Sequence, residues 1–248
     1  MIEVLKDIGF IIKDSIPKKF NSCANFNNSK LLESVNENSN LLELEEFISK
    51  LGLCSDLPKV FPNNMQQFLG IGYQIWQYPH QLAKLMEFAK LNNVQSYLEL
   101  GVYHGGTFVA MTSYLKKSLG RNISAVAVDI ASNKPLETYI KQNGFEFKKM
   151  PSYSRRFVRF LKGKQFDMVL IDANHSFESV MNDFLILKNH ARIMAFHDIV
   201  DANCPGVVKF WKWLKNSGDY HTIEYIDQYP EIELKNQKYL GIGVVTRK

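Results

Sequence analysis

The 248-residue chain has few cysteines and no long hydrophobic run. Its cysteines, Cys23, Cys54 and Cys204, are odd in number and widely spaced, without a CxxC pair. This spacing argues against a disulfide framework or a zinc site and favours reduced thiols. No segment approaches the ~20 apolar residues that cross a membrane, and the amino-terminal stretch lacks the uninterrupted apolar region of a signal peptide. We therefore expect a cytoplasmic protein with no membrane partner.

A dense tract of lysine and arginine is also missing, and the formal net charge is only +5. Because nucleic acids bind concentrated positive charge, the composition gives little support to a nucleic-acid partner. Apolar residues, in contrast, make up 46% of the chain and include 17 phenylalanines. They indicate a packed core, and the length suits one sizeable α/β domain or a smaller domain with an appendage.

The first part of the chain has a helical pattern. Apolar residues between positions 4 and 12 fit one face of a short helix, and residues 78–93 carry the apolar stripe of a longer one. Asn40 followed by Glu43 predicts the capped start of a further helix. We expect residues 1–90 to form a helical amino-terminal region that covers a pocket or makes a homodimer contact.

From residue 95 onward, short apolar strands alternate with helical patterns, which places the main domain at residues 91–248. The alternation predicts an α/β fold with a Rossmann-like, doubly wound and mostly parallel sheet, whose ligands bind at the carboxyl ends of the strands. Seven strands are expected, in "SYLELG", "ISAVAVDI", "FEFKKM", "DMVLID", "ARIMAFHD", "HTIEYID" and "YLGIGVVT".

The first strand runs into a glycine-containing turn, "YLELGVYHGGTF", in which Glu99, Gly101 and Gly105 form an acidic-x-Gly-x-x-x-Gly pattern. Glycine allows a positive φ and a close approach to a ligand, although a tight turn without any ligand is the alternative. A nicotinamide dehydrogenase needs G-x-G-x-x-G, and Tyr103 occupies the second glycine position. Asp129 ends the second strand, where a carboxylate can accept both hydroxyls of a ribose or serve only as a turn residue.

These stretches resemble the class I S-adenosylmethionine-dependent methyltransferases over about residues 95–245. "LELGVYHGG" and "AVAVDI" are similar to the first two motifs of that family, with Thr107 where the family often has serine. "IDANHSFESVMNDF" and "AFHDI" resemble a branch that methylates small molecules. The resemblance implies S-adenosylmethionine as the cofactor and a small-molecule acceptor. It also implies a donor site lined by Glu99, Gly101 and Gly105 at the methionine part, Asp129 at the ribose, Ser152 near the adenine, and Asp172.

The fourth predicted strand changes abruptly from apolar residues to Asp172, Asn174 and His175. Methyl transfer from a sulfonium is an in-line displacement, and a hydroxyl acceptor needs a base or a metal that lowers its pKa. Asp172 and Asp198 end neighbouring strands and are predicted to share a divalent ion, preferably Mg²⁺, through oxygen ligands. His175 is then the predicted base, acting together with Asp172.

Two of these assignments have a plain structural alternative. Adjacent residues of a strand point to opposite faces, so His197 can join Asp198 as a metal ligand only if the strand ends between them. His175 can instead hydrogen-bond a carbonyl at the start of the following helix.

The sequence therefore predicts an S-adenosylmethionine-dependent methyltransferase that acts on a small molecule, with a hydroxyl as the preferred acceptor. A nicotinamide-dependent oxidoreductase and a non-catalytic donor-binding partner subunit are the alternatives. A nucleic-acid methyltransferase is disfavoured, because "DANH" stands where base-modifying relatives carry "NPPY" or "DPPY".

A basic cluster lies on the third predicted strand and the loop and helix that follow it. If the cluster borders the site, it favours a phosphorylated, nucleotide-linked or acidic acceptor; otherwise it is a solvated face. Its members are Lys148, Lys149, Arg155, Arg156 and Arg159.

Overall fold

The computed structural model describes residues 29–56, 58–120, 122–232 and 237–248. The short helix expected between positions 4 and 12, and Cys23, lie outside these ranges. None of the helices in the described part of the chain is long and apolar enough to span a bilayer.

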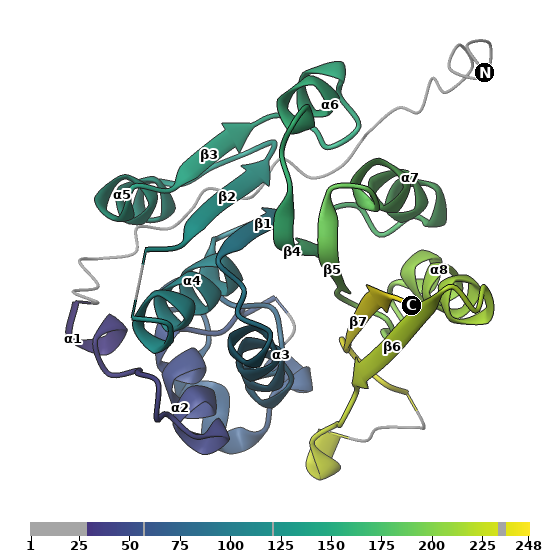
Figure 1. Ribbon diagram of the computed structural model, residues 1–248. Helices are drawn as coiled ribbons and strands as arrows, with labels where there is room; N and C mark the ends of the chain where they lie inside the picture. The colour runs from purple at the N-terminus through teal and green to yellow at the C-terminus, as the bar shows by residue number, and fades with distance from the viewer. Residues whose placement is uncertain (1–28, 57, 121, 233–236) are drawn as a thin grey trace.

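One seven-stranded sheet forms the centre of the molecule, in the order β3-β2-β1-β4-β5-β7-β6 (Figure 1). The first five strands of this order pair in parallel, whereas β7 runs antiparallel to both β5 and β6. The expected mostly parallel α/β sheet is confirmed, and each of the seven predicted segments supplies one strand. The strands are Ser96–Leu100 (β1), Ser124–Asp129 (β2), Glu146–Lys149 (β3), Phe166–Ile171 (β4), Ala191–Phe196 (β5), Tyr220–Tyr225 (β6) and Ile242–Arg247 (β7).

Helices cover both faces of the sheet (Figure 1). α3, α4 and α5 lie on one face, and α6, α7 and α8 lie on the other. Burial from both sides explains why the central strands are continuously apolar. In β4, for example, Leu170 joins the core under α3 and α4, while Val169 and Ile171 join the core on the opposite face. The helices are Pro79–Leu91 (α3), Gly106–Ser118 (α4), Lys134–Asn143 (α5), Arg155–Leu161 (α6), Phe177–Leu187 (α7) and Pro205–Asn216 (α8).

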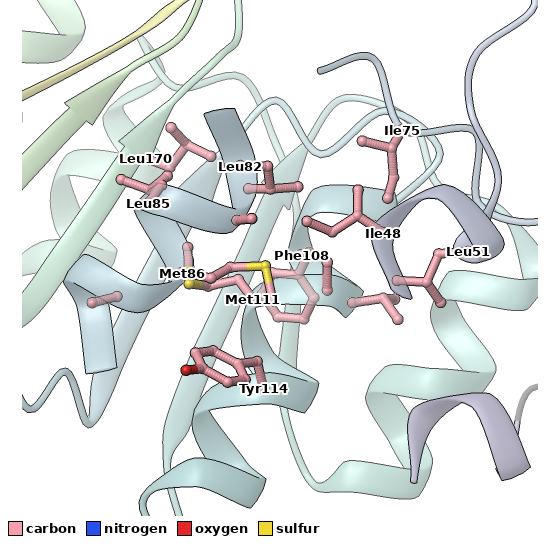
Figure 2. Close-up of a cluster of buried hydrophobic side chains, with 14 of the residues drawn as sticks. Ile48, Leu51, Ile75, Leu82, Leu85, Met86, Phe108, Met111, Tyr114 and Leu170 are labelled. Atoms are coloured by element: carbon pink, nitrogen blue, oxygen red, sulfur yellow. The ribbon is translucent and has the colours of Figure 1, made fainter. Parts of the chain in front are cut away.

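The helices that precede β1 pack into the same core as the sheet. α1 (Ser29–Leu32) leads to α2 (Leu41–Leu51), whose start carries the predicted capping box between Asn40 and Glu43. Two 3-10 turns follow, at Pro58–Val60 and Asn63–Phe68. Figure 2 shows side chains of α2, α3 and α4 packed together. The labelled members from these three helices are Ile48, Leu51, Leu82, Leu85, Met86, Phe108, Met111 and Tyr114.

Candidate active site

The glycine turn after β1 lies directly against the end of β4. Gly101 has φ +80°, and a Cβ atom added there would lie 2.0 Å from the carbonyl oxygen of Asp172. Gly105 has φ +92° at the N-cap of α4, where a Cβ would lie 2.6 Å from a methyl of Leu136. Both glycines are therefore required by a positive φ and by close neighbours, and the turn holds the backbone of Asp172 in place.

Gly101→Ala is expected to destabilise the protein by at least about 2 kcal/mol, because a left-handed conformation and an overpacked contact each cost of the order of 1–3 kcal/mol. Gly163 is the matched control, since it has a similar φ of +73° but no atom within 4 Å of an added Cβ. Thermal and denaturant unfolding of both variants checks the prediction. Equal losses for Gly101→Ala and Gly163→Ala would show that the contact with Asp172 adds nothing.

Asp129 lies at the end of β2 and holds the glycine turn through its carboxylate. One oxygen accepts the backbone N–H of Tyr103 at 2.9 Å, and the other accepts the N–H of Ala131 at 3.0 Å. Each carboxylate oxygen has two lone pairs, so both retain capacity for one hydroxyl donor. The arrangement fits the two hydroxyls of a ribose.

Glu99 is buried at the end of β1, with 1% of its surface exposed. The hydroxyl of Tyr97, which lies two residues earlier and so on the same face of the strand, donates to its carboxylate at 2.5 Å. Burial raises the pKa of Glu99 well above its usual range.

Ser152 lies half-buried in the loop between β3 and α6, near Asp183 of α7. Asp183 is almost fully buried, and burial raises the pKa of its carboxyl to about 6. The structure places Ser152 beside a buried acid of α7, and its role at the adenine remains a prediction.

Two carboxylates and two imidazoles meet beyond the ends of β4 and β5. The Nε2 atom of His175 lies 3.4 Å from Asp172 Oδ1 and 3.1 Å from Asp198 Oδ2. The Nδ1 atom of His197 lies 3.3 Å from Asp172 Oδ2 and 3.2 Å from Asp198 Oδ1. Each imidazole therefore faces both carboxylates, and the ring of His175 faces the acids rather than a helix carbonyl.

The backbone of Asp198 allows His197 and Asp198 to face the same point. β5 ends at Phe196, and Asp198 has φ +61°, a left-handed conformation that is strained for a residue with a side chain. β5 ends before both residues rather than between them, so the alternation of a strand does not apply to His197 and Asp198. Such strain is found preferentially at functional sites.

The charges in this cluster stabilise one another. Hydrogen bonds to Asp172 and Asp198 raise the pKa of His175 to about 10. The same two carboxylates raise the pKa of the buried His197, although burial opposes them, and the imidazoles hold the pKa of both acids low despite burial. Because Asp172 and Asp198 favour the charged imidazole, His175 keeps its proton at neutral pH while no ion is bound.

The cluster fits a divalent ion. One ligand atom each from Asp172, His197 and Asp198 lie within 4.8 Å of one another. Nδ1 is the ring nitrogen of His197 that faces both carboxylates, so it is the atom that would bind the ion. Two oxygen ligands with an imidazole suit Mg²⁺, Mn²⁺ or a borderline transition ion.

The sequence did not predict that a cysteine lies in this cluster. The thiol of Cys204, the N-cap residue of α8, donates to Asp198 Oδ2 at 3.4 Å. Cys204 follows Asp198 by six residues, and this spacing alone does not predict a contact. The contact depends on how the loop after β5 folds back.

Residues 98–199 match a family model that is described as a methyltransferase domain. This segment is therefore similar to a methyltransferase domain. The matched segment begins within β1 and ends one residue beyond Asp198, so it contains the glycine turn, Asp129 and the acid–imidazole cluster. No curated protein matches the sequence of the chain.

Solved structures of O-methyltransferases have a fold similar to that of this chain. The O-methyltransferase from Bacillus cereus, solved in complex with SAH, is 14% identical with a TM-score of 0.54, and the match covers 94% of this chain and 93% of that one. The O-methyltransferase TomG from Streptomyces achromogenes, solved in complex with SAM, is 14% identical with a TM-score of 0.52, and the match covers 70% of this chain and 82% of that one. At these identities the likeness establishes the fold.

Proposed function

We propose that the chain transfers the methyl group of S-adenosylmethionine to a hydroxyl of a small molecule. The observation that carries this proposal is the position of the acid–imidazole cluster beside the glycine turn. Gly101 packs on the backbone of Asp172, while the side chain of Asp172 faces His175 and His197. A donor on the glycine turn and an acceptor on the cluster would therefore be neighbours, as an in-line displacement requires.

The chain offers donor-binding groups along the carboxyl edge of three neighbouring strands. Gly101 and Gly105 shape the turn through their positive φ, and Glu99 presents a buried carboxyl for the methionine part. Asp129 retains capacity for the ribose hydroxyls, and Ser152 belongs to the loop proposed to border the adenine. The O-methyltransferases of similar fold from Streptomyces achromogenes and Bacillus cereus bind SAM and SAH, which supports the choice of donor.

Asp172, His197 and Asp198 are the proposed ligands of a divalent ion, with Mg²⁺ as the first candidate. Such an ion supplies positive charge that lowers the pKa of an acceptor hydroxyl and offsets the two carboxylates. His175 is the proposed base, and it needs the positive charge of the ion to offset the two carboxylates that otherwise raise its pKa to about 10. It is the more exposed imidazole, with 45% of its side chain accessible, whereas His197 is buried.

The segment between α2 and α3 is the proposed cover of the pocket. Its Asp56 accepts a hydrogen bond from the hydroxyl of Tyr103 at 3.3 Å, and Trp76 packs against the ring of Tyr103. An added Cβ at Gly106 would lie 2.3 Å from Ile75, so this segment also touches the start of α4. These contacts close one side of the glycine turn, which favours a buried small ligand.

The acceptor is proposed to be a sugar, a nucleotide-linked molecule or a phosphorylated metabolite. The basic cluster on β3 and α6 motivates the anionic choices, although Lys148 already pairs with Glu146 at 2.7 Å. A homodimer contact through the amino-terminal helices remains a prediction.

The two alternatives fit the site less well. Tyr103 replaces the second glycine of a dinucleotide turn, and its N–H is directed at Asp129. A donor-binding subunit without activity would have no need for a cluster of two carboxylates and two imidazoles in which Asp198 keeps a strained backbone.

Asp129→Ala is expected to weaken the binding of S-adenosylhomocysteine by about 1.5–3 kcal/mol, or roughly 10- to 150-fold, because the ribose hydroxyls lose a charged acceptor. Isothermal titration calorimetry measures the change. Asp219→Ala is the control, since Asp219 is exposed before β6. Equal affinities for the two variants would show that Asp129 does not hold the donor.

A further inference from the structure

We propose that His175, Asp198 and Cys204 form a second ion position, which binds a thiophilic divalent ion such as Zn²⁺ or Co²⁺. One ligand atom from each of these residues lies within 4.8 Å of the others. The set shares Asp198 with the proposed Mg²⁺ ligands but uses the other carboxylate oxygen. It differs from that set in chemistry, because it contributes sulfur and nitrogen together with one oxygen.

The distances between these atoms suit a small tetrahedral ion. Oxygen, nitrogen and sulfur ligands bound to zinc at tetrahedral angles are separated by roughly 3.3–3.5 Å, given zinc–ligand bonds of about 2.0–2.3 Å. Here Asp198 Oδ2 lies 3.1 Å from His175 Nε2 and 3.4 Å from Cys204 Sγ. Small side-chain shifts therefore suffice to admit an ion in place of the thiol proton.

The backbone around Cys204 brings it to the other two ligands. α8 packs its first turn onto the loop of His175, because an added Cβ at Gly206 would lie 2.4 Å from the carbonyl oxygen of His175. Cys204 is the N-cap of this 12-residue helix, so its side chain lies at the turn that packs against the loop of His175. With 45% of its side chain exposed, His175 leaves a path for an ion to enter.

Binding at this position exchanges two protons for the ion and involves no redox step. The thiol of Cys204 and the imidazolium of His175 each release a proton to solvent as the sulfur–metal and nitrogen–metal bonds form. The carboxylate of Asp198 exchanges its contacts with these two groups for the ion. Sulfur and imidazole ligands select zinc-like ions over Mg²⁺. If the proposed function holds, an ion here occupies His175 and blocks its role as a base, so Zn²⁺ would inhibit methyl transfer.

Absorption spectroscopy of the full chain with Co²⁺ tests the site without any need for activity. A Co²⁺–thiolate bond gives a charge-transfer band in the near ultraviolet, which we expect in the wild type. Cys204→Ser should lose this band yet fold normally, because serine is a good N-cap. The double variant Cys23→Ser/Cys54→Ser removes the other two cysteines of the sequence and should retain it.

Competition defines the class of ion. Zn²⁺ at equal concentration should remove the band, while a large excess of Mg²⁺ should leave it. Absence of a band in the wild type, a band that survives in Cys204→Ser, or displacement by Mg²⁺ would each overturn the second ion position. Affinity for S-adenosylhomocysteine, measured on the same samples, tests the proposed function separately and does not depend on this outcome.

Discussion

Asp172→Asn is expected to lower methyl transfer by roughly 10³-fold or more, the scale seen when one member of a catalytic unit is removed. Asparagine keeps the size of the side chain but removes the negative charge that faces both His175 and His197. Transfer of labelled methyl from S-adenosylmethionine to a hydroxyl acceptor, found by screening small molecules, measures the effect.

The affinity of this variant for S-adenosylhomocysteine should stay within a few-fold of wild type, because an uncharged side chain of the same size leaves the glycine turn intact. Asp219→Asn is the control, an exposed acid outside the site. Near-normal turnover in Asp172→Asn would remove this carboxylate from the mechanism.

Chelation separates the role of an ion from that of the carboxylate. If a divalent ion takes part, thorough treatment with EDTA should abolish turnover at neutral pH, and Mg²⁺ should restore it. Without an ion the pKa of His175 is raised to about 10, so its unprotonated form, and with it any residual activity, should increase only as the pH approaches that value. Full activity at neutral pH after chelation would exclude the ion from the reaction.

His175→Ala is expected to lower the rate by about 10²–10⁴-fold, the usual cost of removing a general base. The substitution also removes a proton donor to Asp172 and Asp198, so the pH dependence of the remaining activity should change shape. His221→Ala is the matched control, because His221 is exposed on β6. Unchanged turnover in His175→Ala would reduce this histidine to a structural partner of the two acids.

Much of the fold could be predicted because its strands are buried on both faces. β4 and β5 are continuous apolar runs with abrupt polar ends, which mark both the element and its boundary. α5 was not predicted, although Asn133 caps it and Gly144 ends it. It presents only three buried side chains, Leu136, Tyr139 and Ile140, too few for a clear periodicity.

The site could be predicted where chain order alone decides position. Asp172 and Asp198 follow neighbouring parallel strands, so their proximity follows from topology. The joint orientation of His197 and Asp198 could not be predicted, because it depends on the left-handed backbone of Asp198, and no glycine or asparagine marks that turn. The position of Cys204 could not be predicted either, because it depends on how α8 packs against the loop of His175.

The most direct test of the central claim is calorimetric titration of the wild-type chain with S-adenosylhomocysteine and, separately, with NAD. We predict that S-adenosylhomocysteine binds one site per chain and raises the melting temperature, because a ligand selective for the folded state stabilises it by mass action. NAD should neither bind nor shift the melting temperature. Binding of NAD without binding of S-adenosylhomocysteine would contradict the assignment of this chain as an S-adenosylmethionine-dependent methyltransferase.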